Sequence, residues 1–539
     1  MLNSPFSLEK RLFTPAQKTE NAAPLVFAFP NEYSVGITSL GYQIVWAMLA
    51  QRSDVAVSRL FTDISEPLPA QPELVGFSLS WELDYVNVLD LLEQQQIPIR
   101  ASQREGDHPL VFGGGPVLTA NPEPFAAFFD IILLGDGETL LYDFLDKYQQ
   151  VRELDRQSQL QALAQVPGVY VPELYAVTYQ SPDGPIEAIA PISTDVPAII
   201  KKQTYRGNVL SASTVVTEKA AWENIFMVEV VRSCPEMCRF CLASYLTLPF
   251  RAASIENSLI PAIERGLQAT RRLGLLGASI TQHPEFETLL DYINQSDYDD
   301  VRLSMSSVRA NTVNEKLAKT LVNHGSKSVT IAIESGSQKV RDIVNKKLDT
   351  AEIEVAAQRA KAGGLKALKL YGMAGVPGET EEDLVETANL LKALKQKVPG
   401  LKLTLGCSTF VPKSHTPFQW YGVTQHAKKR LKFLQKHLRS DGIDFRPESY
   451  SWSVIQALIS RGDRRLSDLL ELTRSYGDTL GSYRRAFKTL RGKLPPLDFY
   501  VHQQWPTHQI LPWEHLAGPL PKETLVKHLQ EAQQYMAAD

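Results

Sequence analysis

The chain has 539 residues, 44% of them hydrophobic, which suggests two to four domains with ample buried cores. Its formal net charge of −4 at pH 7 argues against binding to nucleic acid, which is not an expected partner. Four cysteines, three of them clustered, fit a reducing compartment better than a disulfide scaffold, so we expect a cytoplasmic protein.

The first residues carry no recognisable targeting signal. Residues 1–18 are polar and mixed in charge, without the apolar centre of a signal peptide. No apolar run in the chain reaches about 18 residues, the length needed to cross a bilayer. We therefore expect no membrane span.

Residues 20–150 alternate between short apolar runs and helical patterns. The runs predict strands at 25–29, 74–79, 109–112 and 131–134, and helices at 44–49, 85–95 and 139–148. This is a doubly wound, Rossmann-like α/β pattern, in which ligands lie beyond the carboxyl ends of the strands. The glycine turns 113–115 and 135–137 fall at such ends, where the backbone can approach a large flat ligand.

Residues 151–225 are predicted to be a small β-rich connector. It would contain a short helix at 158–165 and a hairpin formed by 168–172 and 175–179, with a later turn at 181–184. We expect no chemistry of its own from this segment.

Residues 226–420 repeat a strand–helix unit six times, which predicts a partial TIM barrel with its site at the carboxyl ends of the strands. The predicted strands are 226–231, 277–280, 301–306, 328–333, 367–373 and 402–409. The predicted helices are 258–273, 285–292, 314–324, 338–344, 351–362 and 381–395.

Residues 421–539 form a mainly helical C-terminal part, with helices expected at 425–441, 451–458, 467–476 and 524–536. Arg461, Arg464 and Arg465 lie close together in this part. Their guanidinium groups could bind an acidic substrate group, or they could form an internal ion-pair network that ties this part to the barrel.

Three cysteines within eight positions are the most informative feature of the sequence. Cys234, Cys238 and Cys241 follow directly on the strand predicted at 226–231. Thiolates are the ligands of iron–sulfur clusters, and three of them leave one iron of a [4Fe–4S] cluster open to another ligand. A zinc site is the alternative, but zinc sites usually pair two C-x2-C knuckles, and no second pair is present.

The spacing C-x3-C-x-aromatic-C, with Phe240 before the last cysteine, resembles the motif of the radical SAM superfamily. This resemblance implies a [4Fe–4S] cluster whose open iron binds S-adenosylmethionine (SAM). It also implies SAM contacts by Glu334, Lys346 and Ser306, and packing of the segment around Gly375 against adenine. Carboxylates suit ribose hydroxyls or an ammonium group because they accept several hydrogen bonds.

One segment departs from the superfamily pattern. Many members carry Gly-Gly-Glu after the second strand, where this chain has residues 277–285, including Thr281 and His283. Backbone carbonyls or Thr281 could bind the SAM amino group instead. His283 is expected to be a hydrogen-bonded loop residue, with a catalytic role as the alternative. Cys407 is expected in the core of the sixth strand, with a catalytic thiol as the alternative.

The first α/β unit resembles cobalamin-binding domains. Their D-x-H-x-x-G motif corresponds to Asn31-x-Tyr33-x-x-Gly36, their later serine to Ser78, and their glycine pair to Gly113 and Gly114, with a further turn at Gly135. A phenol is a poor ligand for a transition metal, so cobalt would lack the lower histidine. The alternative is an inherited fold that holds no cofactor.

Together these resemblances imply a radical SAM enzyme that cleaves SAM reductively and abstracts hydrogen from an unactivated carbon, with cobalamin-assisted methyl transfer or a related radical reaction. An electron donor such as ferredoxin or flavodoxin is the implied partner. One alternative is a methylthiotransferase acting on RNA or protein, although that family usually has three further cysteines before the motif. The other is a non-catalytic iron–sulfur or cobalamin sensor.

Overall fold

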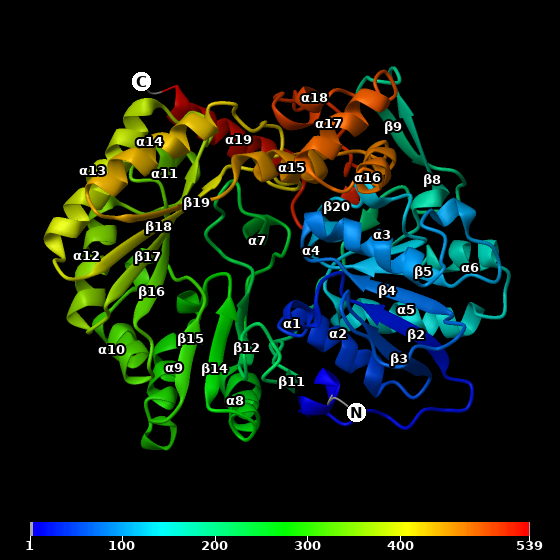
Figure 1. Cartoon of the computed structure of the whole chain (residues 1–539), viewed down its shortest axis with the longest axis horizontal. Helices are drawn as coiled ribbons and strands as arrows, with labels where there is room; N and C mark the ends of the chain where they lie inside the picture. Colours follow the sequence, from blue (N-terminus) through cyan, green and yellow to red (C-terminus); the bar gives the residue numbers. More distant parts are fainter. Residues whose placement is uncertain (1–3, 538–539) are drawn as a thin grey trace.

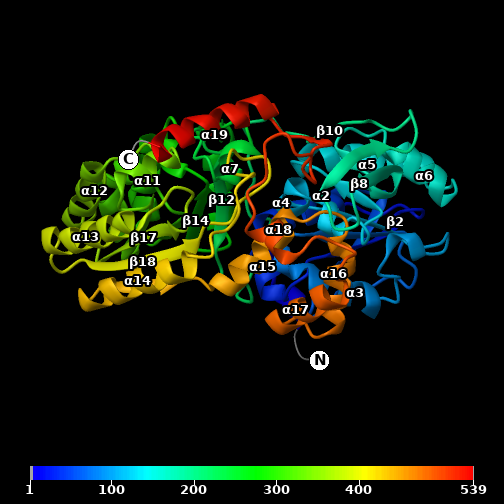
Figure 2. The same cartoon turned by 90° about the horizontal axis from the view of Figure 1, so that it is seen from above.

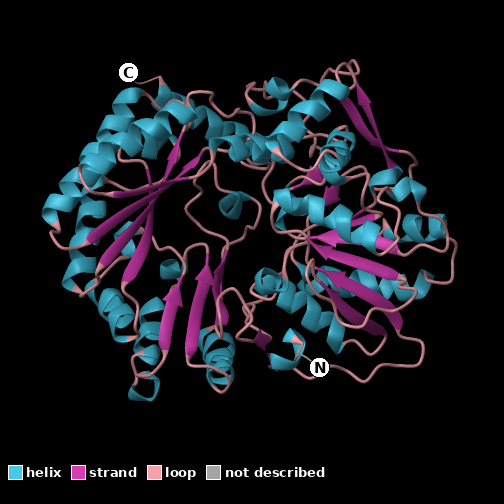
Figure 3. Cartoon of the chain, viewed as in Figure 1, coloured by secondary structure: helices cyan, strands magenta, loops and turns pink. Residues whose placement is uncertain are grey.

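The computed structural model describes residues 4–537. Figure 1 shows two halves side by side, one built from the first third of the chain and the other from its middle, with the last helices running across both. In Figure 3 the strands lie inside each half and most helices outside. The strands of the first half point their carboxyl ends toward the second half.

The first half is organised around a six-stranded sheet with the order β3-β2-β4-β5-β6-β7. Its first five strands in this order run parallel, and β7 is antiparallel to β6. The strands are β2 (Ala23–Ala28), β3 (Val55–Leu60), β4 (Leu74–Ser78), β5 (Leu110–Gly114), β6 (Ile131–Leu133) and β7 (Val169–Tyr170). The order reverses between β2 and β4, and such a switch point opens a crevice at the carboxyl ends of the strands.

Helices cover both faces of this sheet, as a doubly wound fold requires. Helices α2 (Leu40–Gln51) and α5 (Gly137–Val151) contact each other on one face, and α3 (Tyr85–Gln94) lies on the other, as Figure 2 shows from above. The near-continuous burial of β2 and β4 explains their unbroken apolar runs, because both of their faces are covered.

The second half is an open barrel of two four-stranded sheets, β13-β12-β14-β15 and β16-β17-β18-β19. All neighbours are parallel except the short β13 (Arg251–Ala252), and a bridge between Val308 and Ile331 connects the sheets. The parallel strands are β12 (Phe226–Arg232), β14 (Arg272–Gly277), β15 (Arg302–Met305), β16 (Ser328–Glu334), β17 (Ala367–Ala374), β18 (Lys402–Thr409) and β19 (Asp444–Pro447).

An outer ring of helices covers this barrel. Its members are α8 (Ile260–Leu267), α9 (Phe286–Ile293), α10 (Glu315–Asn323), α11 (Gln338–Ile343), α12 (Thr350–Ala362), α13 (Glu381–Lys397) and α14 (Ala427–Ser440). Their starts are set locally: a capping box of Asp349 and Glu352 begins α12, and Asn314 caps α10 by accepting from the Leu317 N–H at 2.7 Å. The predicted partial TIM barrel is confirmed, with β19 as a further parallel strand.

The C-terminal helices connect the two halves. Buried side chains of α15 (Tyr450–Arg461), α16 (Leu466–Ser475) and α17 (Leu480–Thr489) belong to the same hydrophobic core as the first sheet. The short α18 (Leu497–Val501) follows, and the last helix, α19 (Lys522–Met536), returns to the barrel and packs on α11. Residues 421–537 therefore act as a strap across both halves rather than as an appendage of the barrel.

Three elements predicted from the sequence were wrong. The hairpin is formed by β8 (Tyr175–Tyr179) and β9 (Ile186–Pro191) around the turn at 181–184, whereas Val169 and Tyr170 join the edge of the first sheet, where both are buried. The helix predicted at 258–273 ends at Leu267, and residues 272–277 form β14 instead of the predicted 277–280. Pairing of Leu273 and Leu275 with the strands on both sides overrides their helical propensity.

Candidate functional site

The three clustered cysteines lie on a tight loop between β12 and the short helix α7 (Leu242–Tyr245). Ser233 and Met237 adopt left-handed backbone conformations, with φ of 71° and 58°, which let the chain double back. The Cys241 N–H donates to the Cys238 carbonyl at 2.9 Å and closes the last turn. All three cysteines are free thiols.

The three thiols lie within electrostatic range of one another. Burial raises the pKa of the Cys238 thiol to about 12; nearby Lys346 opposes this shift, and the Cys241 and Cys234 thiols add to it. Burial also raises the pKa of Cys241, to which Cys234 again contributes. Binding of a metal group would therefore have to release protons from these buried thiols.

The three thiols do not lie close enough together to coordinate a single metal ion. Across residues 4–537, no three His, Cys, Asp or Glu side chains converge closely enough to hold a metal ion as they stand. Three thiols suit a [4Fe–4S] cluster, in which one iron can take another ligand, whereas a structural zinc site needs a fourth protein ligand.

A buried hydroxyl beside Cys241 also fits an anionic sulfur ligand. Ser244 is fully buried, and its Oγ has no nitrogen or oxygen partner within the described chain. This hydroxyl and the N–H groups of Ala243 and Ser244 face the Cys241 sulfur and lower its pKa against the larger effect of burial. An unpartnered buried donor is costly, so a thiolate that accepts from it would be stabilised.

Glu334 and Lys346 form a buried ion pair next to Cys238. The Lys346 Nζ lies 2.7 Å from Glu334 Oε1, and both side chains are about one-tenth exposed. Glu334 ends β16 with a left-handed φ of 64°, beside an irregularity in its pairing with β17. Burial lowers the pKa of Lys346, but Glu334 and Cys238 outweigh it, so the net pKa is raised and the ammonium stays charged.

Other predicted residues have separate surroundings. Ser306 donates to the Gly277 carbonyl at 2.9 Å across the ends of β15 and β14, and Phe240 is half-buried against the core. Gly375 has a φ of 86°, and its N–H donates to Glu379 at 2.6 Å. It lines a cavity with Tyr421 and other residues around the start of α14, separate from the cysteine loop.

The segment that departs from the superfamily pattern reaches the cysteine loop through Gln282, which the sequence did not single out. Its Oε1 lies 4.0 Å from the Cys234 sulfur, and its amide donates to Glu236. The Thr281 hydroxyl accepts from Thr312 at 2.7 Å. His283 Nδ1 accepts from the Glu285 N–H at 3.0 Å, a loop role in agreement with the expected one.

Cys407 is buried on β18, as expected for a core residue. Burial raises the pKa of its thiol well above the usual range, with smaller contributions from Glu379, Glu448 and Glu334. A protonated, enclosed thiol is a poor nucleophile.

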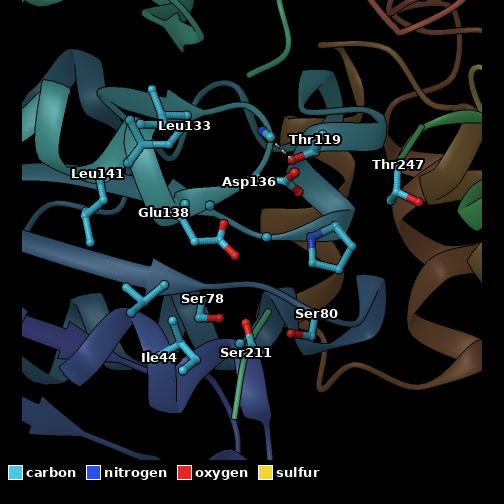
Figure 4. A pocket seen from close by; sticks show the side chains of 18 of the residues that line it. Ile44, Ser78, Ser80, Thr119, Leu133, Asp136, Glu138, Leu141, Ser211 and Thr247 are labelled. Atoms are coloured by element: carbon cyan, nitrogen blue, oxygen red, sulfur yellow. Dashed lines mark hydrogen bonds between the residues drawn. The ribbon is translucent and has the colours of Figure 1, made fainter. Parts of the chain in front are cut away.

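A cavity of about 500 Å³, which we call the cavity above α7, lies between the carboxyl end of the first sheet and helix α7. Figure 4 shows Ser78 and Ser80 on one side of this space and Thr247, from the segment after the cysteines, across from them. Gly114 and Gly135 also line it. The apolar part of the lining comes from the sheet and from the helices α2 and α5: Phe27, Ile44, Val45, Met48, Phe112, Leu140 and Leu141.

Space for a large ligand is available where the lining lacks side chains. A Cβ added at Gly114 would meet nothing closer than the Leu133 carbonyl oxygen at 3.8 Å, and one added at Gly41 would meet nothing within 4 Å. Gly135 differs, because its Cβ would lie 2.0 Å from the Gln203 carbonyl oxygen. The cavity thus has an apolar interior and a few polar groups, the composition typical of cofactor sites.

Four residues of the cobalamin-like motif do not line this cavity: Asn31, Tyr33, Gly36 and Gly113. Tyr33 is buried, donates to Glu9 at 2.7 Å and packs edge-on against Phe61. Added Cβ atoms would lie 2.5 Å from Phe61 at Gly36 and 2.6 Å from Leu118 at Gly113. These glycines permit close packing within the first half.

Charged residues at the rim of the cavity tie the two halves together. Arg232, the last residue of β12, pairs with Glu138 at 2.6 Å, and Arg251 pairs with Asp136 at 2.6 Å. Both acids lie at the start of α5. The cysteine loop is therefore fixed relative to the first sheet by one ion pair before it and one after it.

The arginines of the C-terminal part form an internal network, one of the two expected alternatives. Arg461 is fully buried and donates to the Tyr500 carbonyl at 2.6 Å. Arg464 pairs with the buried Glu123 of the first half at 3.1 Å. The network connects this part to the first sheet rather than to the barrel.

Two family models match this chain. Residues 65–172 match the model described as radical SAM proteins, N-terminal, and residues 228–391 match that of the radical SAM superfamily. The second match contains the three-cysteine loop, Glu334 and Lys346. The chain belongs to the radical SAM superfamily.

The chain is also similar to individual proteins over most of its length. It is 27% identical to an uncharacterized protein of Methanocaldococcus jannaschii over 451 residues, covering 83% of this chain and 90% of the relative. It is 23% identical to an uncharacterized methyltransferase of Pyrococcus horikoshii over 377 residues, covering 67% and 74%. The structure of the radical S-adenosylmethionine methyltransferase TsrM from Kitasatospora setae, with cobalamin and a [4Fe–4S] cluster bound, matches with a TM-score of 0.51 at 13% identity, covering 74% of each chain.

Within residues 4–537, no helix is both long enough and apolar enough to cross a bilayer.

Proposed function

We propose that this protein is a cobalamin-dependent radical SAM enzyme, in which Cys234, Cys238 and Cys241 hold a [4Fe–4S] cluster and the cavity above α7 holds cobalamin. One observation carries the proposal: the cavity is bounded on one side by the carboxyl ends of the first sheet and on the other by Leu242, Ala243 and Leu246, directly after the last cysteine. A cofactor bound there would lie next to the cluster.

The residues present fit both a [4Fe–4S] cluster and cobalamin. Three thiols and the unpartnered Ser244 hydroxyl suit a cluster with one open iron. An apolar cavity with several glycines in its lining suits a corrin and its tail, and the similarity to the fold of TsrM supports the combination. When bound, the cluster would supply the electron that cleaves SAM into methionine and a 5′-deoxyadenosyl radical, and cobalamin would supply a methyl group.

The protein's own residues would position SAM and exclude water. We propose that the Glu334–Lys346 pair binds polar groups of SAM beside Cys238, and that Gln282 binds near Cys234 in place of the usual acidic residue. Phe240 and Ser306 are proposed to lie against the ligand. Gly375 remains a proposed SAM contact, although its surroundings at α14 favour a structural role.

The proposed site residues for cobalamin are Ser78, Gly114 and Gly135, which line the cavity. Tyr33, Gly36 and Gly113 would act indirectly, by shaping the first half. Cobalt would then have no protein ligand from the loop after β2, because the Tyr33 hydroxyl is bonded to Glu9.

The proposed domain boundaries are 20–150, 151–225, 226–420 and 421–539. A cytoplasmic location and an electron donor of the ferredoxin or flavodoxin type are part of the same proposal, because a cluster of this kind needs a reducing environment. Nucleic acid is not a proposed partner, and the methylthiotransferase alternative is disfavoured because no cysteine precedes Cys234.

Anaerobic turnover distinguishes this proposal from a non-catalytic sensor. Reconstituted protein incubated with SAM and dithionite should release 5′-deoxyadenosine, and it should retain hydroxocobalamin through desalting. The Cys238→Ala variant should no longer release 5′-deoxyadenosine. It should still retain hydroxocobalamin, because the substitution leaves the cavity intact. Protein with a full cluster that releases no 5′-deoxyadenosine would contradict the enzyme proposal.

A further inference from the structure

A second cavity, of about 730 Å³, lies in the C-terminal part between α15, α17 and the start of α18. It shares no lining residue with the cavity above α7. Its interior is formed by apolar and aromatic side chains: Tyr450, Val454, Ile455, Leu480, Tyr483, Phe487, Leu494, Pro495, Pro496 and Leu497. A ligand with an apolar body would be well enclosed there.

Three cations line the same cavity. Arg484 and Lys488 lie four residues apart on α17, and Arg491 follows shortly after the helix. All three are exposed. In the described part of the chain, none of the three side chains makes a hydrogen bond or an ion pair that would neutralise its charge.

This grouping contrasts with the rest of the chain. The formal net charge is −4, and three buried or partly buried arginines of the C-terminal part are engaged: Arg461 with backbone carbonyls, Arg464 with Glu123 and Arg465 with Asp463. A single acid, Asp183, is present among the described lining residues. Positive charge is therefore left unneutralised where the cavity opens.

The cavity is held in place by buried contacts. Ile455, Tyr483 and Leu494 are each at most 5% exposed and belong to the core shared with the first sheet. The hairpin tip that carries Asp183 is fixed by Arg465, which donates to the carbonyls of Pro182 and Gly184 at 2.8 and 2.9 Å. A preformed site of this kind loses little entropy when it binds a ligand.

We propose that this cavity is a second ligand site, which binds an amphipathic anion: an apolar body carrying a phosphate group. The apolar body would occupy the space between α15 and α17, and the phosphate would pair with Arg484, Lys488 and Arg491. Arginine forks and lysine ammonium groups are the side chains that recognise phosphate most often. The apolar lining distinguishes this site from a basic surface that binds any anion.

Isothermal titration of the full-length protein with three small probes tests the proposal. 1-Naphthyl phosphate should bind. Inorganic phosphate, which lacks the apolar body, and 1-naphthol, which lacks the phosphate, should each bind at least about tenfold more weakly. Octyl phosphate in a parallel titration distinguishes an alkyl body from an aromatic one, and binding of either phosphate ester supports the site. Equal binding of inorganic phosphate and both phosphate esters would overturn it.

Two variants separate charge from shape. Arg484→Gln with Lys488→Gln should weaken binding of 1-naphthyl phosphate at least about tenfold, because the phosphate loses two partners. Lys432→Gln with Lys436→Gln on α14, which has the same spacing and exposure, should not change it. Val454→Trp should abolish binding by filling the cavity while leaving all three cations in place.

Binding unchanged in the α17 variant, or equally reduced in the α14 variant, would contradict the proposal. Release of 5′-deoxyadenosine in the absence of added substrate should be the same in all variants, because none of the substituted residues lines the cavity between the first sheet and α7. The outcome is therefore independent of the proposed radical SAM function.

Discussion

Lys346 Nζ lies 2.7 Å from Glu334 Oε1, and this ion pair is buried directly beside Cys238. The two residues are 12 positions apart, at the end of β16 and after α11. Their charges compensate each other in a place where either one alone would be costly.

Removing one partner of this pair should destabilise the protein strongly. Lys346→Met leaves the Glu334 carboxylate buried without a counter-ion, which costs about 3–5 kcal/mol. The neighbouring Lys347→Met should cost less than about 1 kcal/mol. The Lys347 side chain is half exposed, and its ion pair with Glu236 is long, at 3.7 Å. Urea unfolding followed by circular dichroism measures both, and equal losses would contradict a special role of the pair.

A side chain placed in the cavity above α7 should block cobalamin. Gly114→Leu introduces a side chain whose Cβ has no contact closer than 3.8 Å, so the fold should be retained. We expect the affinity for hydroxocobalamin to fall at least about tenfold. Gly106→Leu, which also adds a Cβ without close contacts, is the control. Absorbance titration measures both, and unchanged binding by Gly114→Leu would place the cofactor elsewhere.

The Ser244 hydroxyl should tune the cluster. A hydrogen bond to the Cys241 sulfur stabilises the reduced, more negative state, so Ser244→Ala should shift the reduction potential to more negative values. A redox titration followed by electron paramagnetic resonance measures this shift. Ser440→Ala, at an exposed position at the end of α14, serves as the control. A positive shift, or none, would mean that the hydroxyl does not donate to the sulfur.

Glu379 should make stability depend on pH. Burial raises the pKa of Glu379 from 4.5 to about 7, although Arg430 and the Gly375 N–H oppose the shift. The pKa of Glu379 is higher in the folded than in the unfolded state, so protonation of Glu379 stabilises the folded protein. This contribution to the free energy of unfolding is complete below about pH 4.5 and is lost as the pH rises through 7. Wild type should therefore lose up to about 3 kcal/mol relative to Glu379→Gln over this window.

Calorimetric Tm values at about pH 5, 6 and 7 test this expectation. The difference between wild type and Glu379→Gln should change across the series in the stated direction. Glu381→Gln, an exposed acid at the start of α13, should give a constant difference from wild type. A constant difference for Glu379→Gln as well would contradict the raised pKa.

Local sequence patterns predicted most of the strands and helices, but not all of them. The apolar runs at 25–29 and 74–79 correspond to β2 and β4, because strands covered on both faces consist almost entirely of apolar residues. Strand β3 was missed because its burial is only partial and it carries Arg59. The charge of Arg59 is neutralised by Glu9, which is far away in the sequence but lies 2.7 Å from it in the fold. Local composition cannot reveal a partner 50 positions away.

The candidate site was only partly predictable for the same reason. The cysteines are close in sequence, so their proximity follows from their spacing. Gln282 reaches Cys234 from the 3-10 turn that follows β14, and no signal other than its place in a departing segment could have indicated it. Gly36 and Gly113 match a motif by spacing, yet their neighbours Phe61 and Leu118 show that packing also requires glycine there.

The central claim, that three thiolates hold one cluster, is tested most directly by the iron and sulfide content of anaerobically reconstituted protein. Wild type and Cys407→Ala should each contain about four iron and four sulfide ions per chain, and Cys234→Ala/Cys238→Ala/Cys241→Ala should contain almost none. Retention of the cluster by the triple variant, or its loss from Cys407→Ala, would contradict the claim.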